Sequence, residues 1–456
     1  MNNSFLLIGL FLVFTTIAFG TIIKPAFGLA ILIFALPLLS QGFRLYLGGQ
    51  YPFISFETMA VFVLWVFAQF HNIRLRRQVE KDRGLVIATF IFLFAGLFSA
   101  FFAKDSELAF KILLVGAFSP LLCLNIARRH IRSKEDFKLV LFGYFGLVIQ
   151  AGIYTLIVLK NRQGIFQEIS YFASWQYQVG GIYSSPVTIL PSPSVTIATI
   201  VGSIPFAAWY RVYGQKNNVV IWLVVTGFTI WVALMSLSRG SWLGVLVALI
   251  ATLPFYFKTF QIKAIILLIC LTIGLNISGF FDFFLQALNI RLSTQIDTLS
   301  IRLANYQLAL QSSFIHPFIG LGLGNYLEIY RELPHTLAAK MEHLWFAHNL
   351  FLTLIPEIGL VGALAFGYIF ISRIIKGIQL FQIQRDDSDH WLRYSLITTI
   401  VSYIVVVSTS GGHLIAVKTD YLTAPALIVI MTFMGCLTYN YGDLDRRNHL
   451  SDINHE

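Results

Sequence analysis

The sequence predicts an all-helical, polytopic membrane bundle of about 12 or 13 spans, with one large extracytoplasmic loop that contains short helices. Two properties of the composition support this prediction: 57% of the 456 residues are hydrophobic, and only 12% are charged. A soluble domain has about 25% charged residues. The third observation is that long apolar runs recur along the chain, as membrane-spanning helices require.

Thirteen apolar runs are candidates for spans. They fall near residues 5–23, 25–40, 53–70, 84–103, 109–126, 139–159, 194–210, 219–237, 241–257, 264–280, 346–371, 394–409 and 421–438. Only a tight KPAF stretch joins the first two runs, which are therefore either two spans or one long or broken helix. Two spans give 13 in total and place the N-terminus outside, whereas one span gives 12 and places it inside. No basic residue precedes the first run, whereas a cleaved signal peptide begins with a positively charged segment. The first run is therefore expected to be a retained span.

The basic residues gather in alternate connections between the runs. One set of connections holds 21 of the 32 Lys and Arg residues, five of them in 71–83 and five in 128–138, and the other set holds 11. By the positive-inside rule, the richer set faces the cytoplasm. The net charge of +10 therefore reports membrane topology, and no nucleic-acid partner is expected.

This topology divides the chain into three parts. Residues 1–280 form N-terminal transmembrane helices, residues 281–345 form a large periplasmic or extracellular loop, and residues 346–456 form C-terminal transmembrane helices. A loop of 65 residues inside a compact membrane domain is usually functional.

The middle of this loop predicts a helix followed by an irregular turn. Apolar side chains in 294–314 recur at spacings of three and four, which favours a helix that lies on the membrane surface or against the bundle. They are Ile296, Leu299, Leu303, Tyr306 and Leu310. Pro317 is expected to end the helix, and three alternating glycines, Gly320, Gly322 and Gly324, predict the turn.

Two arginines near the outer interface are candidates for binding an anion. Arg239 lies in a turn between two spans and either extends to the lipid headgroups or forms part of an anion site. Arg302 is either a solvated charge or a second member of that site. Together the two could hold a pyrophosphate through bidentate hydrogen bonds. Weaker candidates for the same task are Arg291, Arg331 and Lys418.

Four histidines crowd the end of the large loop. They are His316, His335, His343 and His348. A zinc site is an alternative, but no HExxH or similar spacing supports it, so no metal is expected. His348 and Asn349 stand at the start of an apolar run, where they either cap or pack the helix or act on a substrate. Glu357 lies nine residues further in, and Glu57 lies in the third run; an ionisable group inside a span is a functional candidate or is hydrogen-bonded to a neighbouring helix.

The predicted location of the polar loop restricts its chemistry. Nucleotides are cytoplasmic, so a reaction at the outer face must use a substrate that arrives already activated in the membrane. A polyprenyl pyrophosphate that carries a glycan fits this requirement. Arginines would then stabilise the departing pyrophosphate, and a histidine would take the proton from the attacking hydroxyl.

The stretches SRGSWLG, HPFIGLGLGNY and HNLFLTLIPEIGLVG together resemble the O-antigen ligase and polymerase superfamily of bacterial envelopes, over about residues 220–380. The resemblance implies a bundle in the bacterial inner membrane with its active site on the periplasmic or extracellular side. It also implies metal-independent transfer of a glycan from undecaprenyl pyrophosphate to an acceptor hydroxyl, without a cofactor.

The resemblance assigns roles to individual residues. Arg239 and Arg302 would contact the pyrophosphate of the donor, and His348 would be the base. Asn349 would bind substrate beside it, and the three loop glycines would shape the adjoining turn. Glu357 would serve helix packing. His335 or His343 would replace His348 if the match to the family is shifted.

Several functions remain open at this stage. A ligase and a polymerase share the lipid-linked glycan donor and differ in their glycan or lipid acceptor: the core of lipopolysaccharide, a protein side chain or another lipid-linked repeat. A transporter or flippase of lipid-linked glycans is the alternative from another class, but it would need charges along a path across the membrane. A non-catalytic membrane scaffold is the third possibility.

Overall fold

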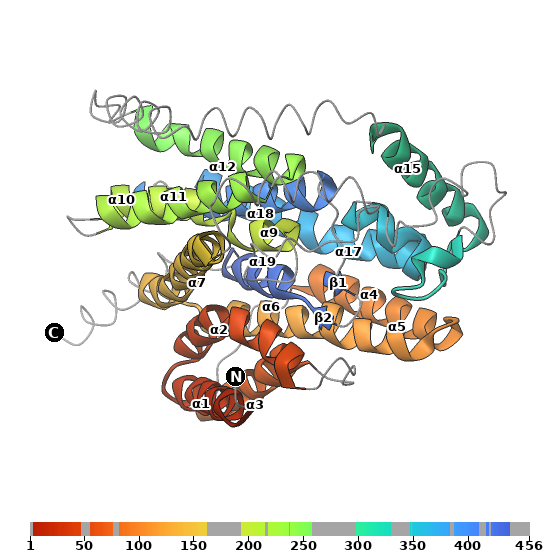
Figure 1. Ribbon diagram of the computed structural model, residues 1–456, viewed down its shortest axis with the longest axis horizontal. Coiled ribbons are helices and arrows are strands. Elements are labelled where there is room, and N and C mark those ends of the chain that lie inside the picture. The colour runs from red at the N-terminus through yellow and green to blue at the C-terminus, as the bar shows by residue number, and fades with distance from the viewer. Residues whose placement is uncertain are drawn as a thin grey trace.

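The computed structural model describes residues 3–46, 55–75, 82–161, 193–214, 218–236, 238–257, 298–329, 347, 349–383, 387–409, 416–418 and 421–437. These residues form a bundle of helices, many of which run along the long axis of the molecule (Figure 1). The predicted polytopic helical bundle is confirmed. Besides the helices, β1 (Ala416–Lys418) and β2 (Tyr421–Thr423) form one short antiparallel hairpin among the described residues.

The helices in chain order are α1 (Asn3–Ile23), α2 (Pro25–Tyr46), α3 (Phe56–Leu75), α4 (Arg83–Phe102), α5 (Ser106–Ile112), η1 (Leu113–Phe118), α6 (Ser119–His130), α7 (Lys134–Asn161), α9 (Pro193–Ile200), α10 (Ser203–Tyr213), α11 (Val219–Met235), α12 (Arg239–Phe257), α15 (Thr298–Ile315), η2 (Tyr326–Glu328), α17 (Leu350–Ile383), α18 (Asp387–Thr409) and α19 (Pro425–Cys436). Among the described residues, six helical stretches are long and apolar enough to cross a membrane, and six further apolar helices are shorter. These twelve coincide with twelve of the thirteen predicted runs. The remaining run, 264–280, lies outside the described residues.

The first two apolar runs form two helices rather than one. Pro25 is the first residue of α2 and supplies no amide hydrogen to continue α1. A Cβ atom on Gly20 would lie 2.9 Å from Ile31 Cδ1. A continuous helix would separate these two residues by about 16 Å, so the chain turns back at Lys24.

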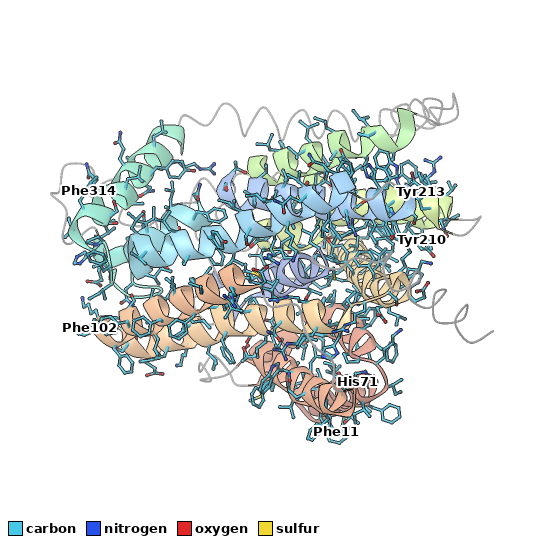
Figure 2. All side chains as sticks on the ribbon, turned by 180° about the vertical axis from the view of Figure 1, so that it is seen from behind. Phe11, His71, Phe102, Tyr210, Tyr213 and Phe314 are labelled. Atoms are coloured by element: carbon cyan, nitrogen blue, oxygen red, sulfur yellow. The ribbon has the colours of Figure 1, made fainter. Side chains whose placement is uncertain are left out.

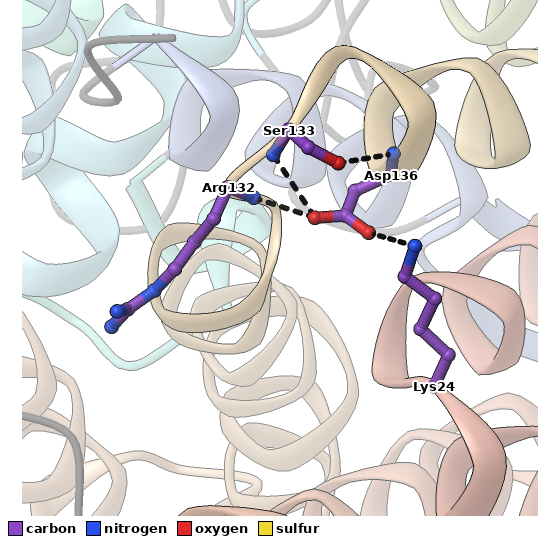
Figure 3. Close-up of polar contacts among 4 residues, drawn as sticks. All are labelled: Lys24, Arg132, Ser133 and Asp136. Carbon is purple, nitrogen blue, oxygen red and sulfur yellow. Dashed lines mark hydrogen bonds and ion pairs between the residues drawn. The ribbon is translucent and has the colours of Figure 1, made fainter. Parts of the chain in front are cut away.

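A polar cluster holds this corner against the start of α7 (Figure 3). Lys24 Nζ lies 2.5 Å from Asp136 Oδ1, and Asp136 Oδ2 accepts hydrogen bonds from the amides of Arg132 and Ser133, each at 3.0 Å. Ser133 Oγ in turn accepts from the Asp136 amide at 3.0 Å, which completes a reciprocal cap of α7.

Two further ion pairs involve the starts of α4, α7 and α18. Lys134 contacts Asp389 at 2.7 Å, and Arg373 contacts Asp82. We call this end of the bundle, which contains residues of the stretches predicted to face the cytoplasm, the basic end. We call the opposite end the turn end (Figure 1). Helices α4 and α18 end there, α5 and α17 begin there, and α15 lies beside them.

The bundle buries one large apolar core and exposes apolar side chains around it. Phe11, Phe102 and Phe314 are 69%, 66% and 86% exposed and point outward (Figure 2). An apolar outer surface is what contact with lipid requires, so the fold is that of a multi-pass membrane protein. A second, smaller apolar cluster at the turn end joins α15 to the start of α17 and consists of Ala304, Leu308, Ala309, Tyr326, Ile329 and Ala347.

Candidate functional site

Helix α17 is broken near its first third. Gly359 has φ 76° and ψ 167°, outside the helical region, and Pro356 lies three residues earlier. Proline removes an amide donor and clashes with the preceding turn, whereas glycine adopts positive φ without steric cost. A straight helix, which would carry Glu357 towards mid-membrane, is therefore not formed.

The turn that contains Gly320, Gly322 and Gly324, called the glycine turn below, closes this break. The amide of Leu321 donates to the Pro356 carbonyl at 2.7 Å, and the amide of Gly322 donates to the Glu357 carbonyl at 2.9 Å. Ser99 Oγ, on α4, donates to the same Glu357 carbonyl at 2.5 Å. Backbone groups freed inside a membrane helix must be satisfied by protein, and here the turn and α4 satisfy them.

The three loop glycines adopt the irregular turn predicted from the sequence. Gly320, Gly322 and Gly324 have φ of 70°, 100° and 76°. A Cβ atom on Gly320 would lie 2.5 Å from backbone atoms of Glu357, and one on Gly322 would lie 2.2 Å from Ala103 Cβ. Glycine is thus required both by the backbone conformation and by the close approach of α17 and α4. Contact of these glycines with a substrate stays a prediction.

A second anchor, which the sequence analysis did not identify, joins the turn to α5. Asn325 Oδ1 accepts a hydrogen bond from the Asp105 amide at 3.1 Å, and Asn325 Nδ2 donates to the Leu323 carbonyl at 3.1 Å. Lys104 forms an ion pair with Glu328 at 3.2 Å. The signal was an asparagine directly after a glycine, a residue that commonly bonds to nearby backbone.

Arg302 extends from α15 to the C-terminal end of α18. Its Nη1 donates to the Thr409 carbonyl at 2.7 Å, and Tyr306, one turn further on, donates to the Ser408 carbonyl at 3.4 Å. The last carbonyls of a helix lack intrahelical partners, and a cation is favoured there. Arg302 is therefore neither simply solvated nor directed only at a headgroup.

The face by which α15 packs differs in part from the predicted stripe, of which Tyr306 does pack against the second apolar cluster. Leu303 and Leu310, members of the predicted apolar stripe, are 52% and 48% exposed. The buried face instead contains Ala304, Leu308 and Ala309. Small alanines allow α15 to approach the start of α17 closely, while Leu303 and Leu310 remain on the outer surface.

Arg239 is the first residue of α12, and its side chain lies outside the described part of the structure. Helices α12 and α18 pack antiparallel: a Cβ on Gly244 would lie 2.1 Å from Val406 Cγ2, and the Phe255 and Trp391 rings are 4.8 Å apart. The first turn of α12 therefore lies beside the last turn of α18, the same helix end that α15 contacts.

Asn349 caps α17. Its Oδ1 accepts hydrogen bonds from the amides of Phe351 at 3.0 Å and Leu352 at 3.2 Å. This is the expected geometry of an N-cap, so the capping interpretation of Asn349 is confirmed and substrate contact stays a prediction. His348, the proposed base, lies outside the described residues.

Other candidates from the sequence also lie outside the described part of the structure: His335, His343, Arg291, Arg331 and the side chain of Lys418 in β1. His316 directly follows α15, with its amide bonded to the Ser312 carbonyl at 2.8 Å. Within the described ranges, no three His, Cys, Asp or Glu residues are grouped to hold a metal ion.

The two membrane glutamates have structural contacts. Glu57 is fully buried, and its Oε2 accepts a hydrogen bond at 3.0 Å from the amide of Ala424, directly before α19. A carboxylate is favoured at a helix N-terminus, so Glu57 caps α19 from a different helix. Glu357 is also fully buried, and its carbonyl receives the two bonds from Ser99 and Gly322.

The fold and these contacts define a multi-pass membrane protein with a polar site at the turn end of its bundle. Residues 222–367 match the family model described as O-Antigen ligase, a segment that includes Arg239, Arg302, the glycine turn and His348. The resemblance to the O-antigen ligase and polymerase superfamily is thus confirmed over this segment, which supports a membrane glycan-processing enzyme of the O-antigen ligase type. A search of curated proteins gave no match.

Proposed function

We propose that the protein transfers a glycan from a polyprenyl pyrophosphate, such as undecaprenyl pyrophosphate, to an acceptor hydroxyl at the outer face of a bacterial inner membrane. The acceptor oxygen forms a bond to the anomeric carbon of the glycan, and the bond from that carbon to the pyrophosphate oxygen breaks. His348 takes the proton of the acceptor hydroxyl. Arg239 and Arg302 stabilise the negative charge on the departing pyrophosphate.

The observation that carries the proposal is the meeting of two arginine-bearing elements at one helix end. Arg302 donates to the Thr409 carbonyl at 2.7 Å, and α12, which begins at Arg239, packs its first turn beside the same end of α18. The helices that carry these two arginines, 63 residues apart in the sequence, thus meet at one helix end, and a dianionic group bound by both guanidinium groups would offset their mutual repulsion.

The sidedness follows from charge. Lys24, Lys134 and Arg373 lie at the basic end, and these residues belong to the Lys- and Arg-rich connections that the positive-inside rule places on the cytoplasmic side. The turn end, with Arg302 and Asn349, then faces the outside. A lipid-borne donor carries its pyrophosphate at the membrane interface, the depth at which these elements begin and end.

A transporter or flippase of lipid-linked glycans is a second candidate, because broken membrane helices often line transport sites. The break in α17 is of a different kind. Its Pro356 and Glu357 carbonyls are bonded to the glycine turn, and that of Glu357 also to Ser99, so they are occupied by protein. This favours an enzyme in which the break fixes the turn.

The proposal is tested by the size pattern of glycan in cells that lack the protein, compared with the parent. Full-length chains retained on the polyprenyl carrier, with none on the final acceptor, are expected for a ligase. A single repeat on the acceptor without long chains is expected for a polymerase. An unchanged pattern in both pools would contradict the proposal.

A further inference from the structure

Ser241 carries a buried hydroxyl that lacks a protein partner. It belongs to the first turn of α12 and is 0% exposed, and its Oγ has no hydrogen-bond partner in the part of the chain that the structure describes. Its amide donates to Ser238 Oγ at 3.4 Å. Buried polar atoms are nearly always paired, so a hydroxyl left without a partner needs an explanation.

The register of α12 and α18 locates this hydroxyl. Gly244 packs on Val406, and the helices run antiparallel, so Ser241 lies at the level of Thr409. The Thr409 carbonyl is the acceptor of the Arg302 guanidinium. Ser241 and Arg302 therefore approach one helix end from two different elements.

The surroundings of Ser241 favour an anion. Helix α12 has 19 residues, and the amides of its first turn carry the positive end of the helix dipole. Side chains of a helix lean toward its N-terminus, so the hydroxyl is directed to the turn end. A guanidinium, a helix N-terminus and a hydroxyl without a partner form a set of donors that suits phosphate oxygens.

We propose that Ser241 is a further donor-binding residue, whose hydroxyl donates a hydrogen bond to a phosphate oxygen of the lipid-borne pyrophosphate beside Arg302. The inference rests on the proposed function and names an additional residue of the same site. Ser241 holds the donor and does not take part in proton transfer.

Ser402 provides a matched control. It is also a fully buried serine whose Oγ lacks a partner among the described residues, and it lies on the same α12–α18 contact. It precedes Thr409 by seven residues, about two helical turns deeper in the membrane. S241A and S402A each remove one hydroxyl from this contact, but only S241A removes it from the proposed site.

The experiment uses the full-length protein in lipid nanodiscs. It measures the affinity for inorganic pyrophosphate by calorimetry, and KM and kcat for glycan transfer from the lipid-linked donor. S241A is expected to weaken pyrophosphate binding and raise KM about tenfold, the effect of losing one hydrogen bond to a charged group, with kcat nearly unchanged. Its melting temperature should equal that of the wild type, because the hydroxyl has no partner to lose. S402A should match the wild type in all three quantities.

Pyrophosphate affinity and KM that are unchanged in S241A would overturn the inference and leave Ser241 as a small residue for helix packing. An equal loss in S402A would also overturn it, because the effect would then come from the helix contact as a whole. A wild type that transfers glycan while S241A behaves identically refutes only the role of Ser241. A wild type that neither binds pyrophosphate nor transfers glycan refutes the proposed function as well.

Discussion

Arg302 Nη1 donates to the main-chain oxygen of Thr409, the last residue of α18, at 2.7 Å. The contact fixes α15, and with it the loop segment that leads to the glycine turn, against the membrane bundle. It also means that substitution of Arg302 removes both a helix cap and a cation from the proposed pyrophosphate site. The two roles can be separated experimentally.

R302K keeps the cation and one donor for the Thr409 carbonyl but loses the planar fork that binds two oxygens at once. We expect the melting temperature to fall little and KM for the lipid-linked donor to rise about tenfold or more. K104A is the control, because Lys104 is an exposed cation at the same end of the bundle, paired with Glu328. A wild-type KM in R302K would show that the planar fork is not needed, and an equal rise of KM in K104A would show that the effect is not specific to Arg302.

G320A should abolish folding of the turn onto α17. The added Cβ would lie 2.5 Å from the Glu357 backbone, and φ of 70° costs an alanine about 1–2 kcal/mol even without this clash. G367A in α17 is the matched control, since a Cβ there meets nothing within 4 Å and should stabilise the helix by about 0.5–1 kcal/mol. Yield and thermal unfolding of both variants are the measurements. Normal folding of G320A would mean that the turn does not dock in the break.

E57A should destabilise the bundle by about 1–3 kcal/mol, because it leaves the buried Ala424 amide without its acceptor. E57Q keeps an oxygen acceptor and should recover most of this loss. Thermal unfolding in nanodiscs compares the three proteins. A Glu57 variant that unfolds like the wild type but fails to transfer glycan would indicate a chemical role for this carboxylate instead.

The Asp82–Arg373 pair at the basic end predicts a pH effect on stability. Burial acts to raise the pKa of Asp82, but hydrogen bonds from Arg373 and the Leu85 amide lower it more, and the net pKa is below its ordinary value. A depressed pKa contributes stability above the unfolded value that is lost as pH falls through the folded value. The melting temperature of the wild type should therefore fall more steeply below about pH 4 than that of D82N. Parallel curves would contradict the contribution of this pair.

Chelation of divalent ions should leave glycan transfer unchanged, because the proposed reaction uses arginines to stabilise the leaving pyrophosphate. Transfer is measured after EDTA treatment and again after addition of Mg²⁺ or Zn²⁺. Strong inhibition that a divalent ion reverses would show that a metal takes part.

Hydropathy was sufficient to predict most of the bundle, since twelve of the apolar runs coincide with helices. It could not reveal the break in α17, because Pro356 and Gly359 lie inside a continuous apolar run and the backbone partners come from 317–322. The buried face of α15 was also missed, since alanine contributes little to an apolar stripe yet permits close packing.

The candidate site was predicted in part. The glycine turn and the cap by Asn349 follow from local sequence chemistry. The partner of Arg302 could not be predicted, because Thr409 is 107 residues away and contributes only its carbonyl. The buried state of Ser241 depends on the register of two helices, which no local pattern records.

The most direct test of the central claim is glycan transfer from a lipid-linked donor by purified wild type, H348A, R302A and K104A in nanodiscs. Loss of the general base should lower kcat about 10²–10⁴-fold in H348A. Loss of the pyrophosphate contact should abolish detectable transfer by R302A, while K104A remains active. R302A also loses its hydrogen bond to the Thr409 carbonyl and should melt at a somewhat lower temperature, so transfer is compared where thermal unfolding shows all four proteins to be folded. Wild-type rates for both H348A and R302A would contradict the proposed site.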